Sequence, residues 1–170
     1  MSPYQAGHAI GFLEIKPGPL YVYIAKGYDA IYTENTIMTV DGSDTYDPDF
    51  FAAKGNYTGM NFTWICYRPV ESPEIDDPSS LPVVYPDGTS SASTGSGGCF
   101  NKGPGRLPFN DTSFTITFDN SLMVRGYTYY IILRVEKRQR FEVNYHITSF
   151  NKHVARIGGL ISKRMVSWVN

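Results

Sequence analysis

Alternation between apolar and polar residues is the dominant pattern of this chain, and it predicts β-strands. In the segment NFTWICY the residues Phe62, Trp64 and Cys66 share one face, while the intervening residues from Asn61 to Tyr67 share the other. We interpret the first face as buried and the second as solvated. The six runs with this strand-like pattern are PLYVYIA (19–25), NTIMTV (35–40), NFTWICY (61–67), SFTITF (113–118), YTYYIILRV (127–135) and FEVNYHIT (141–148).

The apolar faces of these runs define the predicted core. We expect Trp64 to be buried between two sheets, because a tryptophan in a central strand usually belongs to the core and not to a binding surface. The side chains expected to surround it are Phe62, Phe114, Ile116, Phe118, Ile131 and Leu133.

The frequent turn residues between the strands predict an all-β fold. No segment shows a sustained helical period, and the 16 glycines and 11 prolines separate short strands. This organisation is typical of a β-sandwich. Residues 72–98, SPEIDDPSSLPVVYPDGTSSASTGSGG, differ from the rest and predict one long irregular loop, which at that length usually needs a tether.

Length and charge add two constraints. A chain of 170 residues is long enough for one well-packed domain. The net charge is −1, which indicates no bulk attraction to nucleic acid, but residues 1–120 hold 14 acidic and 6 basic side chains whereas residues 121–170 hold 2 and 9. A basic tail could bind phosphates or an anionic membrane surface. We favour the simpler interpretation, in which late strands lie beside early ones and the charges offset each other.

For the basic run KRQR at 137–140 we also favour a structural interpretation over a binding site. It could be a protease site or a polyanion-binding patch, but such runs are more often the solvated tip of a hairpin.

Four aspartates, Asp41, Asp44, Asp47 and Asp49, are concentrated in the stretch VDGSDTYDPDFF and raise the question of calcium. An EF-hand loop requires glycine at its sixth position and glutamate at its twelfth, and counting from Asp41 these positions hold Tyr46 and Ala52. We therefore predict a structural corner in which Asp41 and Asp44 accept hydrogen bonds from backbone N–H groups. A calcium site is the minor alternative, supported only by the density of carboxylates.

The order of the segments now resembles a known family. A strand ending in MTVDGSDTYDPD is followed by FTWICY, then by a second cysteine in GGCF, and then by TSFTITFDNSLMVRGYTYYIILRVEK. This order is similar to the receptor-for-egg-jelly (REJ) region of polycystin-type receptors, which is related to PKD repeats, over about residues 20–149. Simple PKD repeats often carry a W-x-F-G-D-G hairpin after the tryptophan. Here WICYRP stands in its place, which favours the REJ type.

The resemblance implies a fold, a location and a set of partners. The fold would be a PKD-, fibronectin-III- or immunoglobulin-like sandwich over residues 18–149, with residues 1–17 ending a preceding segment or linker and residues 150–170 starting a following module or linker. The parent would be a channel-associated membrane receptor with this region outside the cell, and cilia are one site of such receptors. The partners would be neighbouring modules and a protein or carbohydrate ligand. MSPYQAGHAIGFLE lacks the features of a signal peptide, so an extracellular chain would be a piece of a larger one.

An extracellular origin changes the interpretation of the two cysteines, Cys66 and Cys99. In a cytosolic protein they would be buried thiols or a metal pair lacking partners, and none of the histidines, His8, His146 and His153, has ligand spacing to them. We predict a disulfide that ties the far end of the irregular loop to the sheet. Three N-glycosylation sequons, at Asn56, Asn61 and Asn110, are also predicted to be reachable.

The sequence contains none of the catalytic signatures G-x-S-x-G, H-E-x-x-H or a phosphate-binding glycine loop before a helix. We therefore expect a non-enzymatic interaction or spacer module without a cofactor. The alternatives are a carbohydrate- or polyanion-binding domain that uses exposed tyrosines and the basic tail, and an accessory PKD-like domain of a secreted hydrolase.

Overall fold

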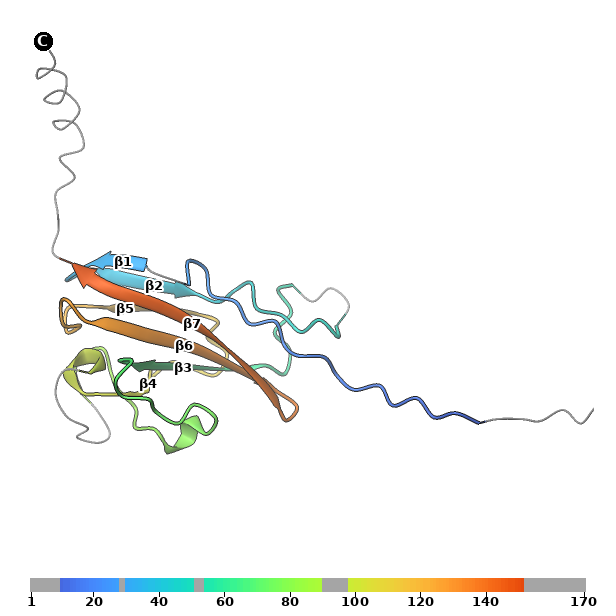
Figure 1. Cartoon of the computed structure of the whole chain (residues 1–170). Coiled ribbons are helices and arrows are strands. Elements are labelled where there is room, and N and C mark those ends of the chain that lie inside the picture. The colour runs from blue at the N-terminus through green and yellow to red at the C-terminus, as the bar shows by residue number, and fades with distance from the viewer. Residues whose placement is uncertain (1–9, 28–29, 51–53, 90–97, 152–170) are drawn as a thin grey trace, which may run out of the picture.

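The structure is a computed structural model that describes residues 10–27, 30–50, 54–89 and 98–151 of the chain. It contains two β-sheets and two short 3-10 turns, at Pro78–Ser80 and Cys99–Asn101 (Figure 1). The strands are β1 (Ala30–Thr33), β2 (Ile37–Asp41), β3 (Asn61–Tyr67), β4 (Gly105–Arg106), β5 (Thr115–Asp119), β6 (Thr128–Lys137) and β7 (Arg140–Asn151). No helix in these ranges is both long and apolar enough to cross a bilayer.

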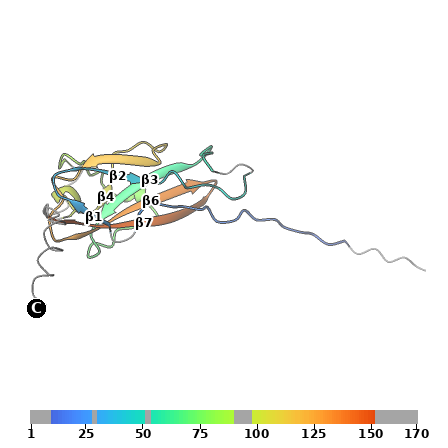
Figure 2. The ribbon, with the colours of Figure 1, turned by 90° about the horizontal axis from the view of Figure 1, so that it is seen from above.

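The strands form the two layers of a sandwich. The larger sheet has the order β1-β7-β6-β3-β4, and the smaller one is the antiparallel pair β2-β5. In the view of Figure 2, the β2–β5 pair forms a separate layer along one face of the larger sheet. The predicted all-β sandwich is therefore confirmed.

Five of the six predicted strands appear, and the first does not. Residues 19–25 form only a single bridge, between Tyr21 and Tyr46. Their remaining backbone groups bond to different partners: the N–H of Ala25 donates to the carbonyl of Asp41, and the Asn144 side chain donates to the carbonyl of Val22. The segment thus lies between the acidic corner and β7 without extending either sheet. The short strands β1 and β4 were not predicted.

The core lies between the two sheets around Trp64, which is only 1% exposed. Its indole Nε1–H donates to the backbone carbonyl of Ser113 at 2.7 Å, so the one polar atom of the ring is satisfied. Phe114 is half-buried and stacks on Tyr57 with ring centroids 4.4 Å apart. The other predicted neighbours are buried: Phe62, Ile116, Phe118, Ile131 and Leu133.

The outer face of the larger sheet is less solvated than predicted. Ile65, Tyr67 and Ile132 form a second buried cluster, against which Ile75 and Leu81 from the irregular loop pack. The prediction of a wet face holds for Asn61, which is exposed, but is wrong for Ile65 and Tyr67. The loop therefore covers this part of the sheet, and β3 is buried on both faces along its second half.

The strands β6 and β7 form a hairpin whose turn residues, Arg138 and Gln139, have φ values of 50° and 68°. Two successive positive φ angles are the geometry of a type I′ turn, which suits the right-handed twist of the flanking strands. These two residues are exposed, as predicted for the tip of a hairpin. The prediction is wrong for the flanking Lys137, which is 4% exposed.

Candidate functional site

The acidic corner between β2 and the following segment is built on close backbone contacts. The Gly42 N–H donates to the carbonyl of Phe114 at 2.9 Å. A Cβ at Gly42 would lie 2.5 Å from Leu133 Cδ2, so only glycine fits here. Asp41 accepts from the N–H of Ser43 at 2.9 Å and from the Thr115 hydroxyl at 2.7 Å. The prediction is therefore confirmed for Asp41 but wrong for Asp44, which is exposed and whose carboxylate accepts no hydrogen bond among the described residues.

Asp47 is the buried aspartate of the corner and binds two cations. It is 1% exposed, and its Oδ2 lies 3.0 Å from Lys137 Nζ and 2.6 Å from Arg140 Nη2. The other guanidinium nitrogen of Arg140 lies 2.9 Å from Asp49 and also donates to the carbonyl of Gly18. The corner is therefore fixed to the end of the β6–β7 hairpin, and here two early acidic residues offset the charges of two late basic ones.

These contacts determine the ionisation of Asp47. Burial opposes its negative charge, but hydrogen bonds from Lys137, from the Asp49 N–H and from Arg140 outweigh burial, so the pKa of Asp47 is lowered. Burial also opposes ionisation of Asp41, and the hydrogen bonds from Ser43 and Thr115 lower its pKa. Both residues are therefore carboxylates at neutral pH, and their charges are satisfied by hydrogen bonds and ion pairs within the corner.

The geometry of the four aspartates bears on the calcium hypothesis. No group of three or more His, Cys, Asp or Glu side chains among the described residues could hold a metal ion. Asp47 and Asp49 face Lys137 and Arg140, whose positive charges would repel a cation.

The two cysteines form the predicted disulfide. Cys66 and Cys99 are joined with Cα atoms 6.0 Å apart, and both are fully buried. Cys66 pairs with Gly105 of β4, and Cys99 opens the 3-10 turn that leads toward β4. The bridge therefore holds the end of the irregular loop against the edge of the larger sheet.

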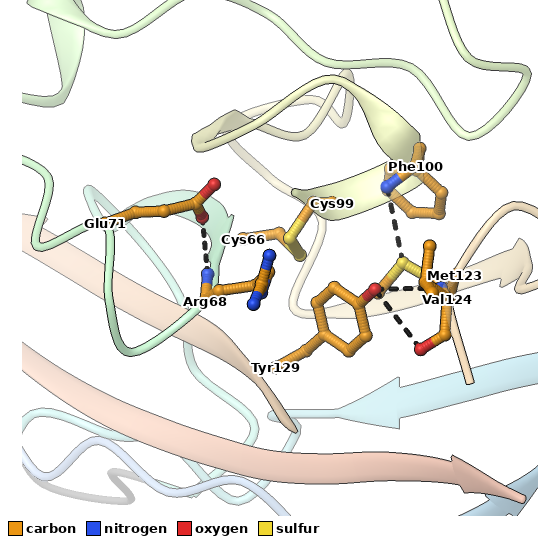
Figure 3. Close-up of a disulfide and its surroundings, with 8 residues drawn as sticks. All are labelled: Cys66, Arg68, Glu71, Cys99, Phe100, Met123, Val124 and Tyr129. Atoms are coloured by element: carbon orange, nitrogen blue, oxygen red, sulfur yellow. Dashed lines mark hydrogen bonds between the residues drawn. A yellow bond between two sulfur atoms is a disulfide. The ribbon is translucent and has the colours of Figure 1, made fainter. Parts of the chain in front are cut away.

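Local contacts fix both ends of this loop around the bridge (Figure 3). The Arg68 N–H donates to the Glu71 carboxylate at 2.6 Å, just after β3. On the other side, the Phe100 N–H contacts the sulfur of Met123 at 3.4 Å, and the Val124 N–H donates to the Tyr129 hydroxyl at 2.8 Å. The disulfide thus lies between the turn that follows β3 and the turn at Met123 and Val124, and hydrogen bonds hold both turns in place.

The three sequon asparagines lie in one region of the molecule. Asn61 begins β3 and Asn110 precedes β5, and both are exposed. Phe62 and Asp111, the residues that follow them, are linked because the Phe62 N–H donates to the Asp111 carbonyl at 2.6 Å. Asn56 is half-buried in a turn in which its side-chain oxygen accepts from the Thr58 N–H. Their glycosylation stays a prediction.

Sequence reasoning missed the cations that bind Asp47, and it missed His146. The pattern KRQR indicated a solvated run, whereas the pleat of the hairpin directs Lys137 and Arg140 inward. His146 is fully buried in β7, with its ring against that of Tyr32. Burial lowers the pKa of His146 to about 4, and the nearby backbone of Lys26 acts in the opposite direction. Neither ring nitrogen has a hydrogen-bond partner among the described residues. The isolated histidine in FEVNYHIT carried no signal for this.

The fold and the buried bridge together define a disulfide-stabilised β-sandwich domain. The REJ domain family matches residues 2–152, and the chain belongs to this family. The match includes the predicted module at 18–149 and the segment before it. No solved structure matches the chain.

Proposed function

We propose that this chain is an extracellular, non-enzymatic interaction or spacer module of a polycystin-type membrane receptor. Membership of the REJ family supports a polycystin-type parent. On this proposal the partners are neighbouring modules of the parent and a protein or carbohydrate ligand, and the domain reaches the membrane only through the parent, in cilia or elsewhere on the cell surface.

The observation that carries the proposal is the buried Cys66–Cys99 bridge within a REJ-family sandwich. Disulfides persist in oxidising compartments and are kept reduced in the cytosol. The bridge also restrains a loop that is too polar along much of its length to fix itself by burial. Both its chemistry and its structural role therefore suit a domain that folds in the secretory pathway.

The use of the ionisable groups supports a non-enzymatic role. Asp47 and Asp49 together neutralise Lys137 and Arg140 in the corner, and Asp41 holds a turn. Such groups are occupied in maintaining the fold and are not displayed to a substrate. The same pairing weakens the polyanion-binding alternative, because two of the late basic residues are already neutralised.

One observation favours a carbohydrate-binding role as the second candidate. Tyr21 and Tyr23 are 45% and 38% exposed, and their rings lie nearly parallel with centroids 6.3 Å apart. The Tyr46 ring lies 4.8 Å from that of Tyr21. Exposed aromatic faces of this kind can contact the apolar face of a sugar ring. Binding to a neutral glycan array that is lost in a Tyr21→Ala, Tyr23→Ala variant would favour this candidate.

The proposed function is tested by secretion from mammalian cells behind an added signal sequence. We expect folded, secreted material to show no free thiol in denaturant without reductant, and two after reduction. Two free thiols in freshly secreted, folded protein would contradict the extracellular assignment. Adjoining sequence provides an independent test, since membrane spans downstream favour the receptor and a neighbouring hydrolase domain favours the accessory-domain alternative.

A further inference from the structure

A polar recess lies on the outer face of the larger sheet, beside the docked irregular loop, and the proposed function does not use it. Its volume is about 540 Å³, which lies within the range of small-molecule sites. Its lining includes two cross-strand pairs of β3 and β6, Asn61 opposite Glu136 and Thr63 opposite Arg134. Residues 76–79 of the irregular loop also line it.

Among the charged residues that line this recess, Arg134 is the buried one, and its hydrogen bonding is incomplete. Its side chain is 8% exposed; Nη1 donates to Glu136 at 2.7 Å and Nη2 to the carbonyl of Asp76 at 3.2 Å. The third nitrogen, Nε, is buried and has no hydrogen-bond partner within the described part of the chain. Because Nε is enclosed, a ligand atom could accept from it only after the Arg134 side chain shifts, and the cost of leaving a buried donor unpaired would favour such a shift.

The charges that line the recess favour a neutral ligand. Two arginines, Arg106 and Arg134, stand with four acidic side chains, and hydroxyls are added by Thr63 and Ser79. The acidic residues are Asp76, Asp77, Asp111 and Glu136. Carboxylates exceed guanidinium groups, which disfavours an anion, while donors and acceptors of both kinds suit the hydroxyl and acetamide groups of a sugar.

A second hollow of about 420 Å³ lies next to the recess and shares the lining residues Thr63, Arg106 and Asp111 with it. This second hollow is lined by the aromatic side chains of Tyr85 and Phe109, among others. Tyr85 is 40% exposed, so its ring is accessible. Polar groups in one part and aromatic surface in the next match the alternation of hydroxyls and apolar ring faces along a short oligosaccharide.

The position of Asn61 identifies the sugar. Asn61 and Thr63 are the first and third residues of a sequon, and both line the recess. We propose that the recess seats the innermost sugars of an N-linked glycan carried by Asn61. This inference rests on the extracellular location in the proposed function. A tethered sugar has an effective local concentration of about millimolar or above, so weak contacts suffice to hold it.

The test compares the removal of the three glycans from the full chain secreted by mammalian cells. Peptide N-glycosidase converts each occupied asparagine to aspartate, and mass spectrometry of peptides follows each site over time. In the native protein we expect release from Asn61 to be at least about tenfold slower than from Asn56 and Asn110, as for a seating free energy of about 1.4 kcal/mol. After denaturation the rates should be equal.

A pair of variants separates seating from general protection. Ser79→Tyr places a bulky side chain on the wall of the recess at an exposed position, and Ser121→Tyr places the same side chain at an exposed position outside it. We expect Ser79→Tyr, and not Ser121→Tyr, to raise the native release rate at Asn61 to that of the other sites. Neither change touches a sequon or the disulfide.

Two results would overturn the proposal. One is native release from Asn61 as fast as from Asn56 and Asn110. The other is an unoccupied Asn61 in an Asn56→Gln variant, in which the neighbouring glycan cannot crowd the site. If either result occurs in a protein without free thiols, only the seating of the glycan is contradicted and the proposed function stands. Free thiols together with three unoccupied sequons would contradict the proposed function as well as the seating of the glycan.

Discussion

Asp47 and Arg140 lie 93 positions apart in the sequence, yet their side chains are 2.6 Å apart in the fold. The contact joins the acidic corner after β2 to the start of β7. Lys137, on the other side of the hairpin turn, binds the same carboxylate oxygen at 3.0 Å. One buried oxygen therefore holds both strands of the hairpin end.

Removing the charge of Asp47 should leave two cations beside a neutral group. Because Lys137 is buried, we expect Asp47→Asn to lower the free energy of unfolding by about 3–5 kcal/mol. The control is Asp49→Asn, whose side chain is 40% exposed and whose loss should cost no more than about 1 kcal/mol. Urea unfolding at pH 7 measures both, and equal effects would show that the buried pair has no special role.

The bridge between Cys66 and Cys99 should stabilise the domain mainly by restraining the unfolded chain. The two cysteines are separated by 33 positions, and the chain-entropy relation gives about 3–4 kcal/mol for a loop of this length. We expect Cys66→Ala, Cys99→Ala to lower the unfolding midpoint and to expose residues 68–89 to proteases. A double variant with an unchanged midpoint would contradict a stabilising role.

Trp64 should contribute more to stability than any single aliphatic side chain of the core. Trp64→Ala removes a buried ring and its hydrogen bond to Ser113, and we expect a cost of about 3–5 kcal/mol. Burial itself is checked by acrylamide quenching in a Trp168→Phe background, where Trp64 is the one remaining tryptophan. Efficient quenching in the folded state would be incompatible with a residue that is 1% exposed.

His146 should make the domain sensitive to mild acid. Its folded-state pKa, about 4, lies below its ordinary value of 6.5, so protons bind preferentially to the unfolded chain. The stability it supports is complete above pH 6.5 and falls as the pH decreases toward 4, by up to about 3 kcal/mol. Urea midpoints at pH 7, 6, 5 and 4 measure the slope, and His146→Gln should flatten it. An unchanged slope in the variant would assign the effect to other groups.

Gly42 should not tolerate a side chain. An added Cβ would lie 2.5 Å from Leu133 Cδ2 and 2.8 Å from the Phe114 carbonyl, and overpacking of this kind costs about 1–3 kcal/mol. Gly11→Ala is the matched control, because nothing lies within 4 Å of its added Cβ. Thermal unfolding of the two variants compares the same chemical change with and without a clash.

The sequence predicted the strands whose alternation reflects one buried and one exposed face. It was misleading on the outer face of β3, where the continuous apolar run Trp64–Tyr67 is the pattern of a strand buried on both sides. That run indicated that another segment covers the outer face of β3, and this segment is the irregular loop. The bond between Asp47 and Arg140 could not be predicted, because it depends on how the corner docks against a distant hairpin. The same holds for the recess, whose lining comes from separate elements.

The parallel pairing of β1 with the end of β7 determines how tension would act on the domain. Ala30–Thr33 lie beside Thr148–Asn151, and residues 10–27 run toward the opposite end of the larger sheet (Figure 1). A pull on the segment before β1 and on the end of β7 would slide these strands past each other. Their hydrogen bonds would then be strained together and not broken one after another. The domain would resist stretching in shear, the direction in which paired strands yield least readily.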